Sequence, residues 1–342
     1  GSGPSPFLNA SNRNGGATHW RVNMRDFGKA LRIQAIVRSA LIQVVIRRYR
    51  EHVPPGIHAR RRALLSYLSA PYVVPPILRE RRQFSNRGIS LAWGRALNEL
   101  GYEVDVVDYR NASFFPRQRY DLFVGHPGPS YARICRALPS SRKVFFATGL
   151  YWKEHNERVA IRALDHVRTT GYPVQARFIF KEEDTALAAS DAVVCLGNGN
   201  VAKSYSTSMR VHPIDNAAFP PERPCVREWK AARHRFLFYS GWGNAHRGLD
   251  LLIESFAQRP WLELHVCQRL ERDFLTVHRR RLDEAANIHL HGVISMRGSK
   301  FYELARRCGW AVFPTCAEGQ PGALIECMAH GLVPIASPQA NI

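Results

Sequence analysis

Two carboxylates, Glu318 and Glu326, stand eight positions apart near the end of the chain, in the run CAEGQPGALIECMAHGLVPIA. A carboxylate only accepts hydrogen bonds, so such a pair suits the hydroxyl groups of a sugar or a ribose. The residues between them begin with Gly-Gln-Pro-Gly at 319–322, which is typical of a turn. The alternative interpretation is a solvated loop glutamate beside a glutamate that caps a helix.

The elements around this loop are expected to place both carboxylates at one end of a sheet. Residues 311–313 predict a strand, Ala323 begins a helical pattern, and residues 332–335 begin the next buried strand. Ligands of an open α/β sheet bind beyond the carboxyl ends of its strands. The free N–H groups at the helix start, at Gly322 and Ala323, and the positive end of the helix dipole suit a diphosphate.

With its strand, loop and helix, the Glu-x7-Glu pattern resembles the signature of retaining family-4 glycosyltransferases (glycosyl transferases group 1) of the GT-B fold. The resemblance implies an α/β protein with two Rossmann-like doubly wound parallel-sheet domains facing each other across a cleft. It implies that Glu318 approaches the donor sugar and that Glu326 binds the nucleotide ribose. The family's C-terminal domain continues with further helices, so the chain, which stops at Ile342, looks C-terminally truncated beside it.

A second loop, SGWGNAHRGLD, follows an apolar run in the same half of the chain. Gly241 and Gly243 permit close approach of the backbone to a ligand. The resemblance implies that Arg247, at the family's lysine position, contacts the diphosphate, which a guanidinium can bind with two parallel hydrogen bonds. Trp242 stands where the family has an arginine, and His246 or a cation from the first domain could replace that missing charge.

The resemblance also implies a place for the nucleotide base. The turn after the predicted strand 287–293 offers the backbone groups of Gly292 and Val293 to the base. His289 and His291 alternate along that strand. We interpret them as core or edge histidines and not as metal ligands.

The acceptor is expected at the carboxyl end of the first sheet. There the family's glycine-rich loop is replaced by a run that includes Asn86, Arg87 and Gly88. His126, in VGHPG after a predicted first-domain strand, is the candidate polar catalytic residue of this cleft. A loop histidine without a role fits that position equally well.

Strands alternate with helices from residue 63 onward, which predicts parallel sheets with right-handed connections. The expected order is a basic N-terminal extension, an acceptor domain, a proline-rich linker and an incomplete donor domain, at 1–62, 63–212, 213–234 and 235–342. The strands are predicted at 63–68, 103–108, 120–125, 143–147 and 191–196, and at 235–239, 262–266, 287–293, 311–313 and 332–335.

The N-terminal extension has two parts. Residues 1–29 are rich in Gly, Ser and Asn and are predicted to be disordered. Residues 30–50 follow helical spacing and carry several arginines, which predicts a basic amphipathic helix. This helix either lies on an anionic membrane surface or packs on the fold by its apolar face.

The overall charge favours anionic partners, because 48 Lys and Arg stand against 28 Asp and Glu, a formal net charge of +20. Nucleic acid is not expected as a partner, since the basic residues are dispersed and no nucleic-acid module is recognised. No run of 18 apolar residues and no signal peptide occur, so we expect a cytoplasmic protein whose only membrane contact is peripheral. The seven dispersed cysteines, without Cys-x-x-Cys or matching histidine spacing, predict reduced thiols and no metal site.

The resemblance, with which these features agree, implies a retaining glycosyltransferase that moves a sugar from a nucleotide-diphosphate sugar to a hydroxyl of a glycan, a lipid or a small molecule. Cell-envelope polysaccharide biosynthesis is the expected setting. No Asp-x-Asp pattern occurs, so neither a metal nor a cofactor is expected. Two alternatives stay open: a nucleotide-sugar epimerase or phosphorylase-like enzyme, and a catalytically degenerate binding or scaffold protein marked by Trp242 and the truncated end.

Overall fold

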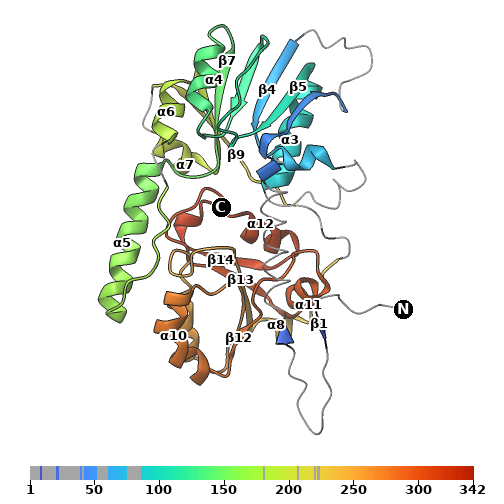
Figure 1. The fold of residues 1–342 in the computed structure, drawn as a ribbon. Coiled ribbons are helices and arrows are strands. Elements are labelled where there is room, and N and C mark those ends of the chain that lie inside the picture. The colour runs from blue at the N-terminus through green and yellow to red at the C-terminus, as the bar shows by residue number, and fades with distance from the viewer. Residues whose placement is uncertain are drawn as a thin grey trace.

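The computed structural model describes residues 8–9, 21–22, 39–40, 42–51, 61–74, 86–179, 182–205, 208–218, 221 and 224–342. Within them the chain forms two sheets built mainly of parallel strands, one above the other and each flanked by helices (Figure 1). The strands of the first sheet fall between residues 45 and 214, and those of the second between 235 and 336. This arrangement agrees with the alternation of strands and helices in the sequence.

The first sheet has seven strands: β3 (Val45–Tyr49), β4 (Arg61–Tyr67), β5 (Tyr102–Asp108), β6 (Leu122–Gly125), β7 (Arg142–Ala147), β8 (Ala192–Leu196) and β9 (Arg210–Ile214). Their order is β3-β5-β4-β6-β7-β8-β9, and only the edge strand β3 runs antiparallel to its neighbour. Central strands such as β4 are buried runs of apolar residues, as expected for strands covered on both faces. The helices between them are α3 (Asn86–Glu99), α4 (Tyr131–Ala137), α5 (Trp152–Thr170), α6 (Glu182–Ala188) and α7 (Gly199–Ser204), with the 3-10 turn η1 (Ala70–Val73) after β4.

The second sheet has five parallel strands: β10 (Arg235–Tyr239), β11 (Glu263–Cys267), β12 (Ile288–Leu290), β13 (Trp310–Phe313) and β14 (Val333–Ala336). Their order β12-β11-β10-β13-β14 places the first strand in the centre, as in a dinucleotide-binding sheet. The associated helices are α8 (Trp229–Ala232), α9 (Leu249–Ala257), α10 (Arg272–Glu284), α11 (Ser299–Arg307) and α12 (Gly322–Ala329), with η2 (Pro338–Ala340) near the end.

Helix α5 connects the two halves of the molecule. It runs down the side of the structure from the first sheet to the level of the second (Figure 1). Arg162 on α5 forms a partly buried ion pair with Asp250 on α9, and His166 near the end of α5 lies 2.9 Å from His278 on α10, measured between the two Nε2 atoms. These contacts fix the two sheets relative to each other, so side chains from both can meet at one site.

Two parts of the N-terminal region differ from the sequence prediction. The amphipathic helix predicted over 30–50 is wrong at Val45–Tyr49, which form β3; residues 39–40 and 42–43 are helical, and 30–38 and 41 lie outside the described residues. The β-branched residues Val45 and Ile46 favour a strand, and the edge of β5 supplies backbone partners that helical periodicity ignores. Within the predicted disorder at 1–29, β1 (Leu8–Asn9) and β2 (Arg21–Val22) pair antiparallel, and the other residues are not described. Of the helices in the described ranges, none combines the length and the apolar character needed to cross a membrane.

Candidate functional site

The candidate site lies where the strand order of the second sheet reverses. β10 is paired with β11 on one side and with β13 on the other, so the connections after β10 and after β13 leave the sheet in opposite directions. Ligands of doubly wound folds bind at such a switch point, beyond the carboxyl ends of the strands. The two loops that start there carry Arg247 and Glu318, which are 71 positions apart in the sequence and in contact in the structure.

Glu318 is the centre of a charged and hydrogen-bonded cluster. Nη1 of Arg247 forms an ion pair with Oε1 of Glu318, and Nε2 of His246 lies 3.2 Å from the same oxygen. Nδ1 of His246 lies 3.4 Å from Sγ of Cys316. The side chains of Arg247 and Glu318 are 11% and 15% exposed, so the pair is largely withdrawn from water. The Arg247 guanidinium also lies over the Phe313 ring, 5.3 Å from the ring centre. Arg247 therefore packs against the end of β13.

The charges in this cluster determine which groups are ionised. Burial alone raises the pKa of Glu318, but Arg247, the hydrogen bond from His246 and the nearby Arg177 together lower it to about 2. Burial lowers the pKa of His246 despite its bond to Glu318. Burial also raises the pKa of the Cys316 thiol to about 11. At neutral pH the site therefore holds a carboxylate, a guanidinium, a neutral imidazole and a protonated thiol, and the thiol is not a nucleophile.

The loop that carries Glu318 is pressed against the first sheet. A Cβ at Gly319 would lie 2.6 Å from the Leu196 carbonyl oxygen and 2.8 Å from Cα of Gly149, so only glycine fits between the carboxyl ends of β7 and β8. The Gln320 side chain accepts a hydrogen bond from the Asn216 N–H at 2.6 Å and donates to Asp215 at 2.8 Å, just after β9. Glu318 is thereby held at the boundary between the two halves of the molecule.

The loop after β10 is tied to the start of α10. The N–H groups of Gly243 and Asn244 donate to the two carboxylate oxygens of Glu271, at 2.9 and 3.1 Å, and the Glu271 N–H donates to the Asn244 side chain at 2.7 Å. Trp242 is 61% exposed. A hollow of about 830 Å³ opens beside this loop. Its lining comprises Gln175, Gly241, Trp242, Arg269, Leu270, Glu271, Arg272, Asp273, Leu275 and Thr276.

Helix α12 starts beside Glu318. Among the described residues, no acceptor takes the N–H groups of Gly322 and Ala323, and the N-cap Pro321 provides no side-chain cap. These groups and the helix dipole can therefore hold an anion. Glu326 lies one turn into α12 and is 6% exposed, so its side chain is buried. All four residues predicted from this stretch thus lie on the loop and first turns that follow β13.

Other predicted residues lie apart from this cluster. Gly292 and Val293 lie after β12, and Val293 is 77% exposed. His126 follows β6, at the switch point of the first sheet, where its Nδ1 lies 3.1 Å from the Phe146 carbonyl oxygen and its ring packs against Tyr67 and Tyr109. Burial lowers the pKa of His126 to about 4, so its imidazole is neutral at pH 7.

The residues predicted to form the acceptor cleft begin α3. Asn86 and Arg87 are exposed, whereas Gly88 is buried. Among the described residues, no hydrogen bond or ion pair joins them or His126 to Glu318 or Arg247. The structure therefore brings Arg247 to Glu318 beside the start of α12, and leaves the predicted base-contacting and acceptor-side residues separate from them.

The sequence analysis did not single out two residues that contribute to this cluster, one within α5 and one beyond its end. The ring of His155 on α5 lies 5.5 Å from the ring of His246, measured between ring centres, with the two planes tilted by 37°. Its Nε2 lies 2.9 Å from the Arg177 carbonyl oxygen. Arg177 is near enough to lower the pKa of Glu318, which makes it a candidate for the cation expected from the first domain. His246 does not supply that charge, because burial favours its neutral form. A lone histidine and an arginine in a non-helical segment carry no signal in sequence spacing that could have identified them.

No protein-family model and no curated protein matches the chain. Among solved structures, the chain is similar to an alpha,alpha-trehalose-phosphate synthase (UDP-forming) from Burkholderia vietnamiensis, with 12% identity and a TM-score of 0.50 over 82% of this chain and 83% of that one. It also aligns with TarM at 14% identity and a TM-score of 0.44, over 63% of this chain and 40% of that one. A third match is the lipopolysaccharide outer core galactosyltransferase WaaB, at 13% identity and a TM-score of 0.44, over 64% of this chain and 57% of that one.

The chain spans less than two thirds of the length of TarM and of WaaB. The likeness to the synthase extends over most of both chains and concerns the fold alone. Together with the two facing sheets and their switch points, it confirms the predicted fold class. The protein is an α/β protein of the GT-B fold, with two Rossmann-like doubly wound halves.

Proposed function

We propose that the protein is a retaining, metal-independent glycosyltransferase that uses a nucleotide-diphosphate sugar as donor and a glycan, lipid or small-molecule hydroxyl as acceptor. The observation that carries the proposal is the contact between Arg247 and Glu318 at the switch point of the second sheet, beside the start of α12. A cation, a carboxylate and free helix N–H groups at one point match the leaving diphosphate and the hydroxyl groups of a sugar.

In the proposed reaction, the bond between the anomeric carbon and the diphosphate oxygen breaks, and its electron pair leaves with the diphosphate. The acceptor oxygen forms the new bond to the same face of the anomeric carbon, and its proton passes to the departing phosphate oxygen. Arg247 and the N–H groups of Gly322 and Ala323 stabilise the charge that develops on the diphosphate. Arg247 contacts Glu318 through Nη1 and Trp242 through Nε, and its guanidinium has further N–H donors for a phosphate oxygen.

The two glutamates have different roles in this proposal. Glu318 stays ionised and fixed by Arg247 and His246, so it orients the donor sugar through its hydroxyl groups. Glu326 accepts hydrogen bonds from the ribose. His126 and the start of α3, at Asn86 and Arg87, form the acceptor side at the switch point of the first sheet. Gly292 and Val293 contact the base.

The first experiment is a thermal-shift screen of the chain against UDP-, GDP-, ADP- and CMP-sugars. UDP-sugars are tested first, because the trehalose-phosphate synthase with the same fold is a UDP-forming enzyme. A ligand at a hundredfold excess over its dissociation constant stabilises the native state by about 2.7 kcal/mol, which raises the melting temperature. We expect a shift with one nucleotide class only.

The Glu326→Ala variant tests the site itself. Loss of hydrogen bonds to a carboxylate costs about 1.5–3 kcal/mol, so donor affinity measured by calorimetry should fall about 10–150-fold. Glu284→Ala, which removes an exposed glutamate on α10, is the matched control and should bind the donor unchanged. Unchanged affinity in Glu326→Ala would refute the ribose assignment.

Turnover separates the remaining alternatives. A transferase consumes donor only in step with an acceptor, apart from slow hydrolysis, whereas an epimerase converts the donor alone. The bonds from Gly243 and Asn244 to Glu271, and Trp242 at the arginine position, favour the degenerate binding protein as the second candidate. Donor binding without turnover over a broad panel of acceptors would support that candidate.

A further inference from the structure

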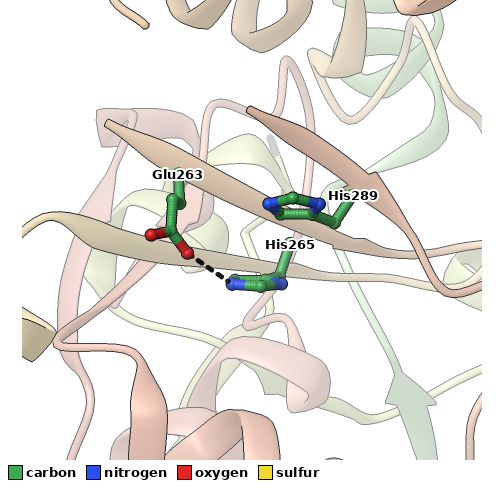
Figure 2. Close-up of side chains that lie close together, drawn as sticks. All are labelled: Glu263, His265 and His289. Carbon is green, nitrogen blue, oxygen red and sulfur yellow. Dashed lines mark ion pairs between the residues drawn. The ribbon is translucent and has the colours of Figure 1, made fainter. Parts of the chain in front are cut away.

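A cluster of imidazoles and one carboxylate lies on the second sheet, away from the loops that carry Glu318 and Arg247. Glu263 and His265 are two positions apart on β11, so their side chains share one face of the sheet. His289 on β12 is the register partner of His265. Figure 2 shows the Glu263 carboxylate directed at the His265 ring, with the His289 ring over it.

The spacing of these groups approaches that of metal ligands. Oε2 of Glu263 lies 3.6 Å from Nε2 of His265, and one ligand atom from each of Glu263, His265 and His289 lies within 4.8 Å of the other two. Ligand atoms around a tetrahedral zinc ion, with bonds of about 2.0–2.2 Å, are about 3.4 Å apart. Glu263 and His289 are only half-buried, so rotation of their side chains can close the remaining distance.

The orientation of His265 is fixed from its other side. Its Nδ1 lies 3.0 Å from Nε2 of His291, and its side chain is 3% exposed. Nε2 of His265 is buried without a hydrogen-bond partner among the described residues, which is uncommon for a polar atom. When Nδ1–H donates to His291, the Nε2 lone pair faces a carboxylate oxygen with no proton between them. A cation between these two acceptors removes the conflict.

The surroundings have the features of a site that holds its ligands ready. A ligating histidine usually donates its other N–H to a neighbour, and a ligating carboxylate is itself hydrogen-bonded. His291 takes the first role, and Arg235, whose Nε lies 3.1 Å from Oε2 of Glu263, takes the second.

We infer that Glu263, His265 and His289 bind one divalent transition-metal ion of the zinc type, with His291 holding the tautomer of His265. Two imidazole nitrogens and a carboxylate oxygen are common zinc ligands, and they leave a fourth position for water. The ion would join the edge strand β12 to β11. Sequence spacing missed this site because its ligands come from two strands that pair only in the folded sheet. The inference does not depend on the proposed transfer reaction.

The test is a titration of the chain, prepared without a polyhistidine tag, with zinc chloride against a chromophoric chelator. We expect one zinc ion per chain. His289→Asn and Glu263→Gln should each weaken binding more than about 100-fold, and His291→Asn about 10–100-fold, as for an outer partner. His212→Asn, which removes an exposed imidazole on β9, is the matched control and should leave zinc affinity unchanged. Circular dichroism of each variant checks that the fold is retained.

X-ray absorption at the zinc edge gives a second readout that does not depend on folding of a variant. We expect about four nitrogen or oxygen neighbours at about 2.0–2.2 Å, two of them imidazoles. Sulfur at about 2.3 Å would place the ion at the cysteines and overturn the inference. Equal zinc affinity in the unchanged chain and in His289→Asn, or no stoichiometric binding, would overturn it as well.

Discussion

Two clusters in the second half of the molecule are built from the same residue types and behave differently. At the switch point, Glu318 meets Arg247 and His246; on the sheet face, Glu263 meets Arg235 and His265. Nε2 of His246 lies 3.2 Å from the Glu318 carboxylate and is hydrogen-bonded to it, and Nδ1 of His246 contacts the Cys316 thiol. Nε2 of His265 lies 3.6 Å from the Glu263 carboxylate and has no hydrogen-bond partner among the described residues.

The difference shows that residue type alone does not define a site. The Glu318 carboxylate is already neutralised by a guanidinium that is 11% exposed, so the cluster forms a fixed charged surface for a polar substrate. At Glu263 the arginine and the glutamate side chains are 27% and 34% exposed. The ligand atoms of Glu263, His265 and His289 lie within 4.8 Å of one another, and His291 contacts the other side of the His265 ring. At Glu318 the protein itself supplies the cation that balances the carboxylate. At Glu263, His265 and His289 we propose that a bound metal ion supplies it.

The largest expected difference between the clusters is in stability. Arg247→Met keeps the apolar contact with Phe313 and leaves the Glu318 carboxylate buried without its cation, so it should cost about 3–5 kcal/mol. Arg235→Met breaks a pair that solvent screens, and should cost at most about 1 kcal/mol. Urea unfolding at pH 7 measures both. Similar losses in the two variants would show that the two ion pairs are equally important.

Next in size is the effect on transfer. If Glu318 orients the donor sugar, Glu318→Gln should lower the turnover rate about 100-fold, because misplacement by about 1 Å has that effect. Glu263→Gln is the matched change in the other cluster and should leave the rate within about twofold. Initial rates at saturating donor measure this. A rate that falls equally in both variants would mean that the sheet face takes part in the reaction.

Acid should destabilise the two clusters in different pH ranges. The folded-state pKa of Glu318 is about 2 against an ordinary 4.5, so its stabilisation is complete above about pH 4.5 and is lost as the pH falls toward 2. The folded-state pKa of His265 is about 4 against 6.5, so its contribution is complete above about pH 6.5 and is lost toward pH 4. Each group adds a slope of at most about 1.4 kcal/mol per pH unit.

This pH prediction can be read from two variants. Unfolding free energy should depend less on pH between 4.5 and 2 in Glu318→Gln, and less between 6.5 and 4 in His265→Asn. Zinc should extend stability further toward acid in the unchanged chain and not in His265→Asn, because protons and metal compete for Nε2. A slope that both variants change in the same range would contradict the separation of the clusters.

The smallest expected effect is coupling between the two clusters. No described contact joins Glu263, His265 or His289 to Glu318 or Arg247, and sites without shared partners couple by less than about 0.5 kcal/mol. Donor affinity measured by calorimetry with and without zinc should therefore differ by about twofold or less. A larger difference would indicate that the β11–β12 face and the switch point respond to each other.

Local sequence pattern was sufficient to predict the strands, the loop and the helix that carry the donor-side residues. The turn at 319–322 between an apolar strand and a helical pattern predicted β13, its loop and α12, and the strands β10 and β11 fall within one residue of their predicted bounds. The same method failed at Val45–Tyr49, where helical spacing over 30–50 concealed the strand β3. The edge of β5 decided that segment, and a partner that distant does not appear in periodicity.

The sequence alone determined the alternation of strands and helices, and with it the positions of Glu318, Glu326 and Arg247 on loops and first helical turns. Turn residues and apolar spacing are local signals, so they are readable without the fold. Only the tertiary structure decided that β10 lies beside β13, which brings Arg247 to Glu318, and that α5 and its following segment deliver His155 and Arg177 to the same place. It likewise decided that His265 and His289 share one sheet face, because strand order and register arise from packing between segments that are far apart in the chain.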